Sequence, residues 1–277
     1  IRRSGVTSRT IVSSWVSMGG AELGSSRFLP DESGLAAIEQ QITEQELDGI
    51  LMIGGFTGYR GAYMLRQAAA TRPALSIPIV CMPASINNDL PGSELSVGAD
   101  TALNSIVRDV DKIKQSAVAS QRTFVVEVMG KECGYLALMS GLATGAERVY
   151  LPEEGITLRD LQVDVEALSA SFARGKRLGL VIRSENADDV YTTSFIKALF
   201  EREGGDLFDV REAVLGHVQQ GGNPSPFDRI QATRLASTSI RQLVELANRT
   251  EPTGLIAGLR QGKVRFTPLN DLPQLME

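Results

Sequence analysis

The feature that most constrains the fold of this chain is a repeated alternation of short apolar runs with segments of helical periodicity. Seven runs have the composition of buried strands: residues 11–12, 49–53, 77–81, 123–128, 148–151, 178–182 and 254–258. Apolar residues recur at the helical period between these runs, for example at Leu103, Ile106, Val110 and Ile113. Such alternation is typical of parallel βαβ units with right-handed crossovers and helices on both faces of a sheet. The sequence therefore predicts an α/β fold.

Start and stop signals bound three of the expected helices. Ser33 is a candidate N-cap for a helix that runs to about Gln45. A second helix is expected from Thr157 and is ended by Gly175. Ser225-Pro226 begins a long helix to about Asn248, because proline is favoured in the first helical turn. The tail after residue 258 carries no readable motif.

Length and charge exclude several function classes. The 277 residues are enough for two α/β lobes or one large domain. The net charge is -5, with 28 basic and 33 acidic residues, and the basic residues are scattered. No stripe of positive charge marks a nucleic-acid or membrane-surface partner, so we expect neither.

The two cysteines and the single histidine limit redox and metal chemistry. Cys81 and Cys133 lie in apolar or glycine-flanked settings, which favours buried reduced thiols of a cytoplasmic protein over a disulfide. No metal-ligand spacing exists, and no apolar run approaches 18 residues, so a soluble chain without a metal site is expected. The chain begins at Ile1 in what reads as mid-domain sequence, which suggests an excised or processed piece of something longer.

Polar loops follow three of the apolar runs, at the strand ends where open α/β sheets build their ligand crevices. Residues 82–93 follow the run 77–81 and contain Ser85, Asn87 and Asp89. Residues 54–58 form a glycine turn, whose backbone N–H groups either approach a phosphate or only make a tight bend. After the run 123–128, Gly130, Lys131 and a helix start together predict an anion pocket.

These loops resemble those of the 6-phosphofructokinases in order and spacing. Residues 85–92 are similar to the family's substrate loop, Thr-Ile-Asp-Asn-Asp-Ile-Pro-Gly, and residues 126–131 to its sugar-binding segment, Val-Glu-Val-Met-Gly-Arg. Residues 215–222 resemble its phosphate motif, Leu-Gly-His-x-Gln-Arg-Gly-Gly, and residues 19–27 its glycine-rich arginine stretch. The resemblance covers about residues 19–258.

The resemblance implies a phosphofructokinase-like α/β fold, with two Rossmann-like lobes of largely parallel sheets and the site between them. The nucleotide-lobe-like domain would comprise residues 1–98 plus 219–258. The sugar-phosphate-binding lobe would comprise residues 99–218 plus 259–277. The family's first strand and glycine-rich loop have no counterpart before residue 19, which fits a truncated chain.

The same resemblance assigns roles to individual residues. The substrate or effector site would contain Ser85, Asn87, Asp89, Met129, Gly130, Lys131, Glu185, His217 and Gln220. Two arginines, Arg122 and Arg211, would reach a phosphate across a subunit interface. The former nucleotide side would consist of Arg27, Gly54, Gly55 and Phe56.

This sequence departs from the family's catalytic pattern at several of these positions. Asn87 replaces the aspartate that serves as catalytic base, and an amide cannot accept the proton of a sugar hydroxyl at neutral pH. Phe56 replaces the aspartate that organises Mg²⁺, and a phenyl ring offers no oxygen ligand. Gln220 replaces an arginine, and Lys131 keeps the charge of an arginine but loses its bidentate fork. Catalytic residues are therefore not assigned.

Three functional hypotheses follow. The first is a regulatory half of a tandem-duplicated, cytoplasmic ATP-dependent 6-phosphofructokinase, which binds a sugar bisphosphate such as fructose 2,6-bisphosphate. Its partner is a catalytic half or a second copy, and Mg-ATP binds only in the catalytic half. The second is an active phosphofructokinase with Asp89 as base, and the third is a non-enzymatic oligomerisation module. ATP and pyrophosphate both stay open as donors in the family enzyme.

Overall fold

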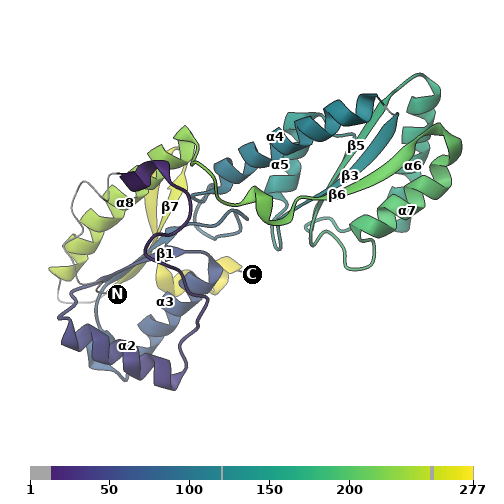
Figure 1. Cartoon of the computed structure of the whole chain (residues 1–277). Coiled ribbons are helices and arrows are strands. Elements are labelled where there is room, and N and C mark those ends of the chain that lie inside the picture. Colours follow the sequence, from purple (N-terminus) through teal and green to yellow (C-terminus); the bar gives the residue numbers. More distant parts are fainter. Residues whose placement is uncertain (1–13, 120, 250–252, 277) are drawn as a thin grey trace. The chain divides into compact units, whose positions relative to one another are not determined.

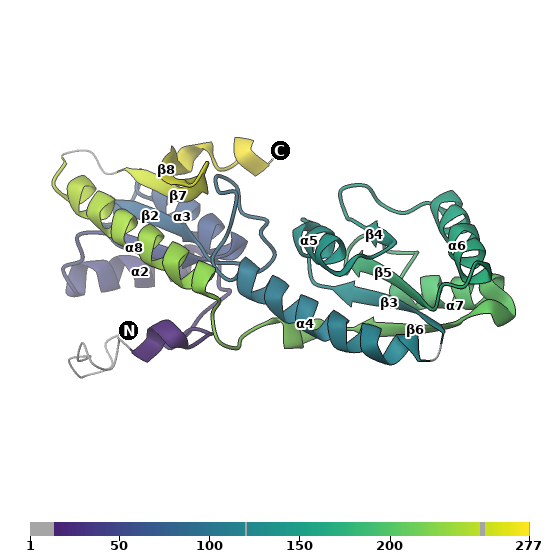
Figure 2. The ribbon, with the colours of Figure 1, turned by 90° about the horizontal axis from the view of Figure 1, so that it is seen from above.

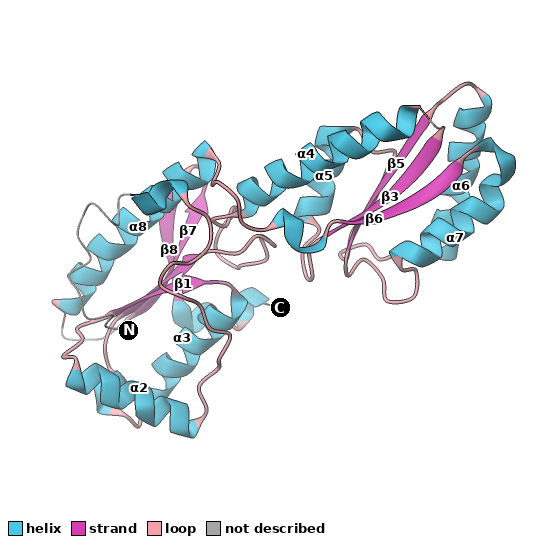
Figure 3. Cartoon of the chain, viewed as in Figure 1, coloured by secondary structure: helices cyan, strands magenta, loops and turns pink. Residues whose placement is uncertain are grey.

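The structure is a computed structural model that describes residues 14–119, 121–249 and 253–276 (Figure 1). The chain divides into two compact units, which are described separately. Unit 1 comprises residues 1–98 and 222–277, and unit 2 comprises residues 99–221. The described residues contain two four-stranded sheets, one in each unit, and helices flank both sheets (Figure 3).

The sheet of unit 1 has the strand order β1-β2-β7-β8. Its strands are β1 (Ile50–Gly54), β2 (Ile79–Pro83), β7 (Gly254–Arg260) and β8 (Lys263–Pro268). The first three are parallel, and β8 pairs antiparallel with β7. Loops after the parallel strands therefore gather at one edge of the sheet.

Helices cover both faces of this sheet, with α2 (Glu32–Glu44) and α3 (Phe56–Ala68) on one face and α8 (Pro226–Ala247) on the other (Figure 1). Successive side chains of β2 point to opposite faces of the sheet. Ile79 and Cys81 belong to the core under α2 and α3, whereas Val80 and Met82 pack with α8 residues. Short 3-10 turns complete the described part of the unit: η1 (Trp15–Ser17), η2 (Pro73–Leu75), η5 (Leu269–Asp271) and η6 (Gln274–Met276).

The sheet of unit 2 has the order β4-β5-β3-β6, and all its neighbours are parallel. Its strands are β3 (Arg122–Val128), β4 (Arg148–Tyr150), β5 (Leu178–Ser184) and β6 (Asp209–Val214). Helices α4 (Ala99–Val118) and α5 (Tyr135–Thr144) lie on one face, and α6 (Leu158–Ala173) and α7 (Thr193–Gly204) lie on the other (Figure 2). Two 3-10 turns, η3 (Gly205–Leu207) and η4 (Gly216–Gln219), flank β6.

The predicted α/β fold is confirmed, and six of the seven expected strands lie in the described residues. The seventh, residues 11–12, falls outside them. Helices α6 and α8 begin and end close to their predicted bounds, with N-caps Thr157 and Ser225. The predicted cap Ser33 is wrong: Asp31 caps α2 by accepting a hydrogen bond from the Gly34 N–H at 2.8 Å. That bond is the main reason why the pKa of Asp31 lies below its ordinary value.

The tail of the chain differs from the expected domain assignment. Residues 259–277 were expected in the sugar-phosphate lobe, but they belong to unit 1, because β8 extends its sheet and Leu269 and Leu272 enter its core. Gln261 and Gly262 join β7 to β8, and both have positive φ angles, as a tight hairpin turn requires. The hairpin was missed because Gln-Gly is a weaker turn signal than Asn-Gly or Asp-Gly.

Neither cysteine is in a disulfide, and only one of the two is buried. Cys81 in β2 has no exposed surface, and burial raises the pKa of its thiol to about 12. Cys133 is only half-buried, which corrects the expectation for that residue.

We therefore expect one reactive thiol in the folded chain at pH 8. The thiolate is the reactive form, so a raised pKa together with burial keeps Cys81 protonated and inaccessible, whereas Cys133 is labelled. A thiol titration should count one group in buffer and two in denaturant. Rapid labelling of two groups in the native chain would contradict the buried position of Cys81.

Candidate functional site

In unit 1 the candidate site is the loop that follows β2. Ser85 Oγ donates a hydrogen bond to Asp89 Oδ1 at 3.3 Å, and Asn87 Nδ2 donates to Asp89 Oδ2 at 3.4 Å. Both oxygens of the Asp89 carboxylate therefore accept bonds from the loop itself. Asn87 acts as a donor here, and its amide has no basic atom with which to take a proton.

Asn88, which the sequence analysis did not single out, braces this loop internally. It has a φ of +57°, and its Oδ1 accepts a hydrogen bond from the Ser96 N–H at 2.7 Å. Its Nδ2 donates to the Glu94 carbonyl at 3.0 Å, and Ser96 Oγ accepts from the Ser85 N–H at 2.6 Å. Asparagine is among the residues that tolerate a left-handed conformation, which was the one available signal.

The β7–β8 hairpin holds the far end of the same loop. The Leu259 N–H donates to Ser93 Oγ at 2.9 Å, and the Glu94 N–H donates to the Leu259 carbonyl at 2.8 Å. The Gln261 N–H donates to both oxygens of the Glu94 carboxylate, at 3.1 and 3.0 Å. Because these partners lie more than 160 residues apart in the chain, no local pattern could have predicted them.

The predicted nucleotide side lies beside this loop. A Cβ on Gly55 would lie 3.7 Å from the Ser85 Cβ, so the glycine turn at Gly54 and Gly55 and the polar loop are neighbours. Phe56 is the first residue of α3, whose first turn holds no acidic residue. Gly54, Gly55 and Phe56 therefore offer no carboxylate ligand to a magnesium ion. Arg27 is exposed, and in the described residues no hydrogen bond or ion pair joins its side chain to the loop.

In unit 2 the predicted residues gather at the carboxyl ends of β3, β5 and β6. The Met129 N–H donates to Gln219 Oε1 at 3.1 Å, and Gln219 Nε2 donates to the Gly216 carbonyl at 2.9 Å. Gln220 Nε2 lies 3.3 Å from the Met129 sulfur. The buried Gln219, which the sequence analysis passed over, thus fixes the η4 turn that carries the exposed His217.

Glu185 joins the same cluster from the end of β5. Its Oε1 accepts a hydrogen bond from the Gly130 N–H at 3.3 Å, and Ser184 Oγ donates to the Gly130 carbonyl at 2.7 Å. At the start of α5, the Gly134 N–H donates to Glu153 Oε1 at 2.8 Å. Three backbone donors of the expected anion pocket, at Met129, Gly130 and Gly134, are therefore engaged by side chains of the chain, while Lys131 is exposed.

The two arginines predicted to cross an interface lie elsewhere in unit 2. Arg122 Nε and Arg211 Nη2 each lie 3.7 Å from Asp209 Oδ2, so one carboxylate joins them. Arg122 begins β3, and the length of that strand puts it about 20 Å from Val128, after which the loop with Gly130 follows. Neither arginine meets the carboxyl-end cluster of its own unit.

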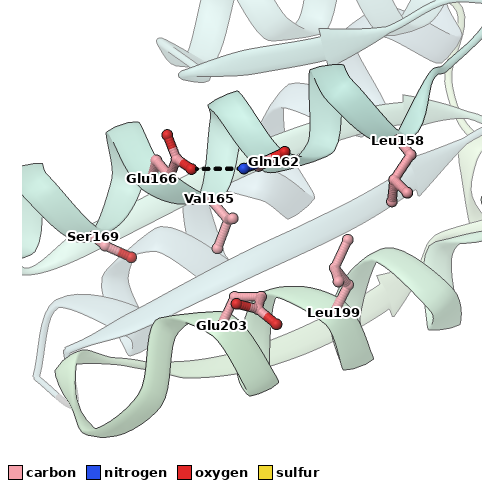
Figure 4. A pocket seen from close by; sticks show the side chains of 7 residues that line it. All are labelled: Leu158, Gln162, Val165, Glu166, Ser169, Leu199 and Glu203. Atoms are coloured by element: carbon pink, nitrogen blue, oxygen red, sulfur yellow. Dashed lines mark hydrogen bonds between the residues drawn. The ribbon is translucent and has the colours of Figure 1, made fainter.

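Unit 2 also has a groove between α6 and α7 that the sequence analysis did not predict (Figure 4). Its volume is about 510 Å³, and it is lined by Leu158, Gln162, Val165, Glu166, Ser169, Leu199 and Glu203. Gln162 Nε2 donates to Glu166 Oε1 at 3.0 Å across one wall. None of the predicted site residues lines this groove.

Metal clusters and membrane spans were also sought. Among the described residues, no three His, Cys, Asp or Glu side chains are grouped so that they could hold a metal ion. Within the same part of the chain, each helix is too short or too polar to cross a membrane.

Comparison with known proteins places these loops in a family. The phosphofructokinase family profile matches residues 3–243. The chain is 46% identical over 269 residues to the ATP-dependent 6-phosphofructokinase of Dictyostelium discoideum, covering 96% of this chain and 32% of that protein. It is 42% identical over 272 residues to the muscle-type enzyme of Oryctolagus cuniculus, covering 94% of this chain and 35% of that protein. It thus spans about a third of the length of these curated relatives.

Solved structures agree with the sequence relatives. The phosphofructokinase of Saccharomyces cerevisiae matches with a TM-score of 0.92 at 36% identity, covering 96% of this chain and 37% of that one. The T-state enzyme of Pichia pastoris matches with a TM-score of 0.90 at 37% identity, covering 98% and 33%. On its loops, its fold and these matches, the chain belongs to the phosphofructokinase family.

Proposed function

We propose that this chain is a regulatory half of an ATP-dependent 6-phosphofructokinase, which binds fructose 2,6-bisphosphate as an effector and has no turnover of its own. The observation that carries the proposal is that the loop after β2 is held by hydrogen bonds but has an amide where the family has its catalytic base. The loop is fully braced, yet the position of the family's base is held by Asn87, whose amide donates to Asp89. In this proposal, the polar side chains of the loop remain available to a ligand, whereas the carboxylate that would take a proton at position 87 is missing.

The former nucleotide side supports the same proposal. Phe56 opens α3 where a carboxylate would be needed to organise Mg²⁺, and no acidic residue follows in the first turn. Phosphoryl transfer depends on metal ions that neutralise charge between the phosphates. This half therefore takes no Mg-ATP, which belongs to the catalytic half.

In this proposal, side chains of unit 2 hold the sugar bisphosphate. Lys131 and His217 are exposed and would meet a phosphate group, and Gln220 would supply an amide donor. Glu185, half-buried against Gly130, would accept hydrogen bonds from sugar hydroxyls. The backbone N–H groups of Met129 and Gly130 are engaged within the chain, so they would orient these side chains more than they would contact the ligand.

Arg122 and Arg211 would serve a partner instead. They lie at or near the starts of their strands, away from the carboxyl-end cluster, with side chains 33% and 48% exposed. We propose that they reach a phosphate bound by a catalytic half or by a second copy, in a cytoplasmic assembly.

The test is calorimetric titration of the 277-residue chain with fructose 2,6-bisphosphate and with fructose 6-phosphate, beside an assay with Mg-ATP. We expect saturable binding of the bisphosphate and no turnover. Lys131→Ala and His217→Ala should each weaken binding about tenfold or more, because each removes a charge-assisted or direct bond to phosphate. Lys197→Ala is the matched control, since the ion pair that Lys197 makes among the described residues is with Glu201, one turn further along α7.

Other outcomes would select the other hypotheses. Turnover that disappears in Asp89→Asn would mean an active enzyme with Asp89 as base. Firm subunit association without binding of either sugar phosphate would favour an oligomerisation module.

A further inference from the structure

Arg183 is a buried cation whose role the proposed function does not yet explain. It is the sixth residue of β5, it is only 1% exposed, and it is among the largest fully buried side chains of the described residues. It lies directly across from Glu127 of β3 in the parallel register. Arginine is rarely buried to this extent unless its charge is paired and its donors are satisfied.

The guanidinium is surrounded by acceptors. Its Nη1 donates to Glu127 Oε2 and to the Glu185 carbonyl, both at 3.0 Å. Its Nε donates to the Tyr191 carbonyl at 3.2 Å, and its Nη2 donates to the Asp188 carbonyl. Burial lowers the pKa of Arg183, and the charge of Glu127 opposes that shift. Arginine nevertheless stays charged at neutral pH.

The three carbonyls belong to one loop, residues 185–191, which connects β5 to α7. This loop folds around the guanidinium, and Asp188 Oδ1 tightens it further by accepting the Val190 and Tyr191 N–H groups at 2.7 Å. The planar fork of arginine reaches several acceptors at fixed angles, which the single ammonium of lysine cannot do.

Glu185 is the residue of this loop that faces the candidate site. Its backbone N–H donates to the Val128 carbonyl at 2.8 Å, its carbonyl accepts from Arg183, and its carboxylate meets the Gly130 N–H. Arg183 therefore fixes the backbone from which the Glu185 carboxylate projects.

We propose that Arg183 is a positioning residue that acts through Glu185, holding its carboxylate on the Gly130 N–H and aimed at the hydroxyls of a bound sugar phosphate. The second part of this inference rests on the proposed function. The first part concerns the unliganded chain and is tested without any ligand.

The first experiment measures hydrogen exchange of the Gly130 amide in Arg183→Lys, in Glu185→Gln and in the double variant. We expect about tenfold faster exchange in each single variant, because a charge-assisted hydrogen bond is loosened, and no further increase in the double variant. Arg148→Lys is the matched control, since Arg148, in the neighbouring strand β4, pairs with Asp164 of α6 at 3.0 Å, and among the described residues no hydrogen bond or ion pair joins it to residues 185–191. Unchanged exchange in Arg183→Lys would overturn the proposal.

The second experiment titrates the same variants with fructose 2,6-bisphosphate. We expect each single variant to bind about tenfold more weakly, and the double variant to bind no more weakly than Glu185→Gln alone. If the loss of affinity in the double variant equals the product of the losses in the two single variants, Arg183 acts independently of Glu185, and the inference is overturned.

This inference can fail or hold independently of the proposed function, and a second variant tests it if the first does not fold. If the wild-type chain binds no sugar phosphate, the proposed function fails, while the exchange of the Gly130 amide still decides whether Arg183 positions Glu185. If Arg183→Lys does not fold, Glu127→Gln releases the same guanidinium from one side. It should speed exchange of the Gly130 amide in the same direction, and unchanged exchange would again count against the proposal.

Discussion

Replacing Gly258 with alanine is expected to destabilise unit 1 by about 3 kcal/mol or more, because the new methyl group would collide with backbone. A Cβ at this position of β7 would lie 2.0 Å from the Gly92 carbonyl oxygen and 2.7 Å from the Gly92 carbonyl carbon. Neither atom can rotate away as a flexible side chain could. The strand and the candidate loop therefore must separate.

The measurement is urea denaturation together with hydrogen exchange of the Leu259 and Gln261 amides, whose acceptors are Ser93 and Glu94 of the loop. Both amides should exchange faster in the variant. Gly61→Ala is the matched control, because Gly61 lies inside α3 with its nearest contact at an ordinary 4.0 Å. That change should be neutral or stabilising, since alanine favours a helix over glycine by about 1 kcal/mol. A Gly258→Ala chain as stable as the control would mean that the hairpin does not press on the loop.

The second large effect is expected for Gly130→Ala in unit 2, again about 3 kcal/mol, from backbone strain and collision together. Gly130 has a φ of +142°, which residues with side chains rarely adopt. A Cβ would also lie 2.6 Å from the Cys133 carbonyl oxygen and 2.7 Å from Ser184 Oγ. The loop would have to move away from Ser184 and from the Glu185 carboxylate, so the sugar-phosphate binding that we propose for it should be lost as well.

Gly145→Ala separates the two causes. Gly145 also has a positive φ, +69°, but nothing lies within 4 Å of the position of its Cβ. The free energy of unfolding of this variant should therefore fall by only about 1 kcal/mol, the conformational cost of a side chain at positive φ. Equal free energies of unfolding for the two variants would show that the collision at Gly130 is relieved without cost.

Local chemistry made part of this structure predictable. Apolar runs of strand length, separated by helical periods, predicted the parallel sheets, because periodicity reports directly which side chains face a core. The polar loops at the strand ends were predicted for the same reason, since parallel strands bring their carboxyl ends to one edge. The consequences of Asn87 and Phe56 follow from side-chain chemistry alone, because no fold turns an amide into a base or a phenyl ring into an oxygen ligand.

The N-cap of α2 differs from the prediction because two neighbouring residues compete for the same position. Asp31 and Ser33 both belong to residue types that cap helices, and their spacing alone does not rank them. In the structure Ser33 Oγ donates to Asp31 Oδ1, and the carboxylate takes the Gly34 N–H.

The sequence by itself thus determined the α/β class, the position of each candidate loop and the side-chain chemistry that each loop offers. Only the tertiary structure decided what holds those loops. The β7–β8 hairpin binds Gly92 and Glu94 of the first loop. In unit 2, Gln219 binds the Met129 N–H and Arg183 binds the loop that contains Glu185. The physical reason is range. Periodicity and capping act within a few residues, whereas these bonds join segments brought together by strand pairing, and whether a donor is free or engaged depends on that pairing.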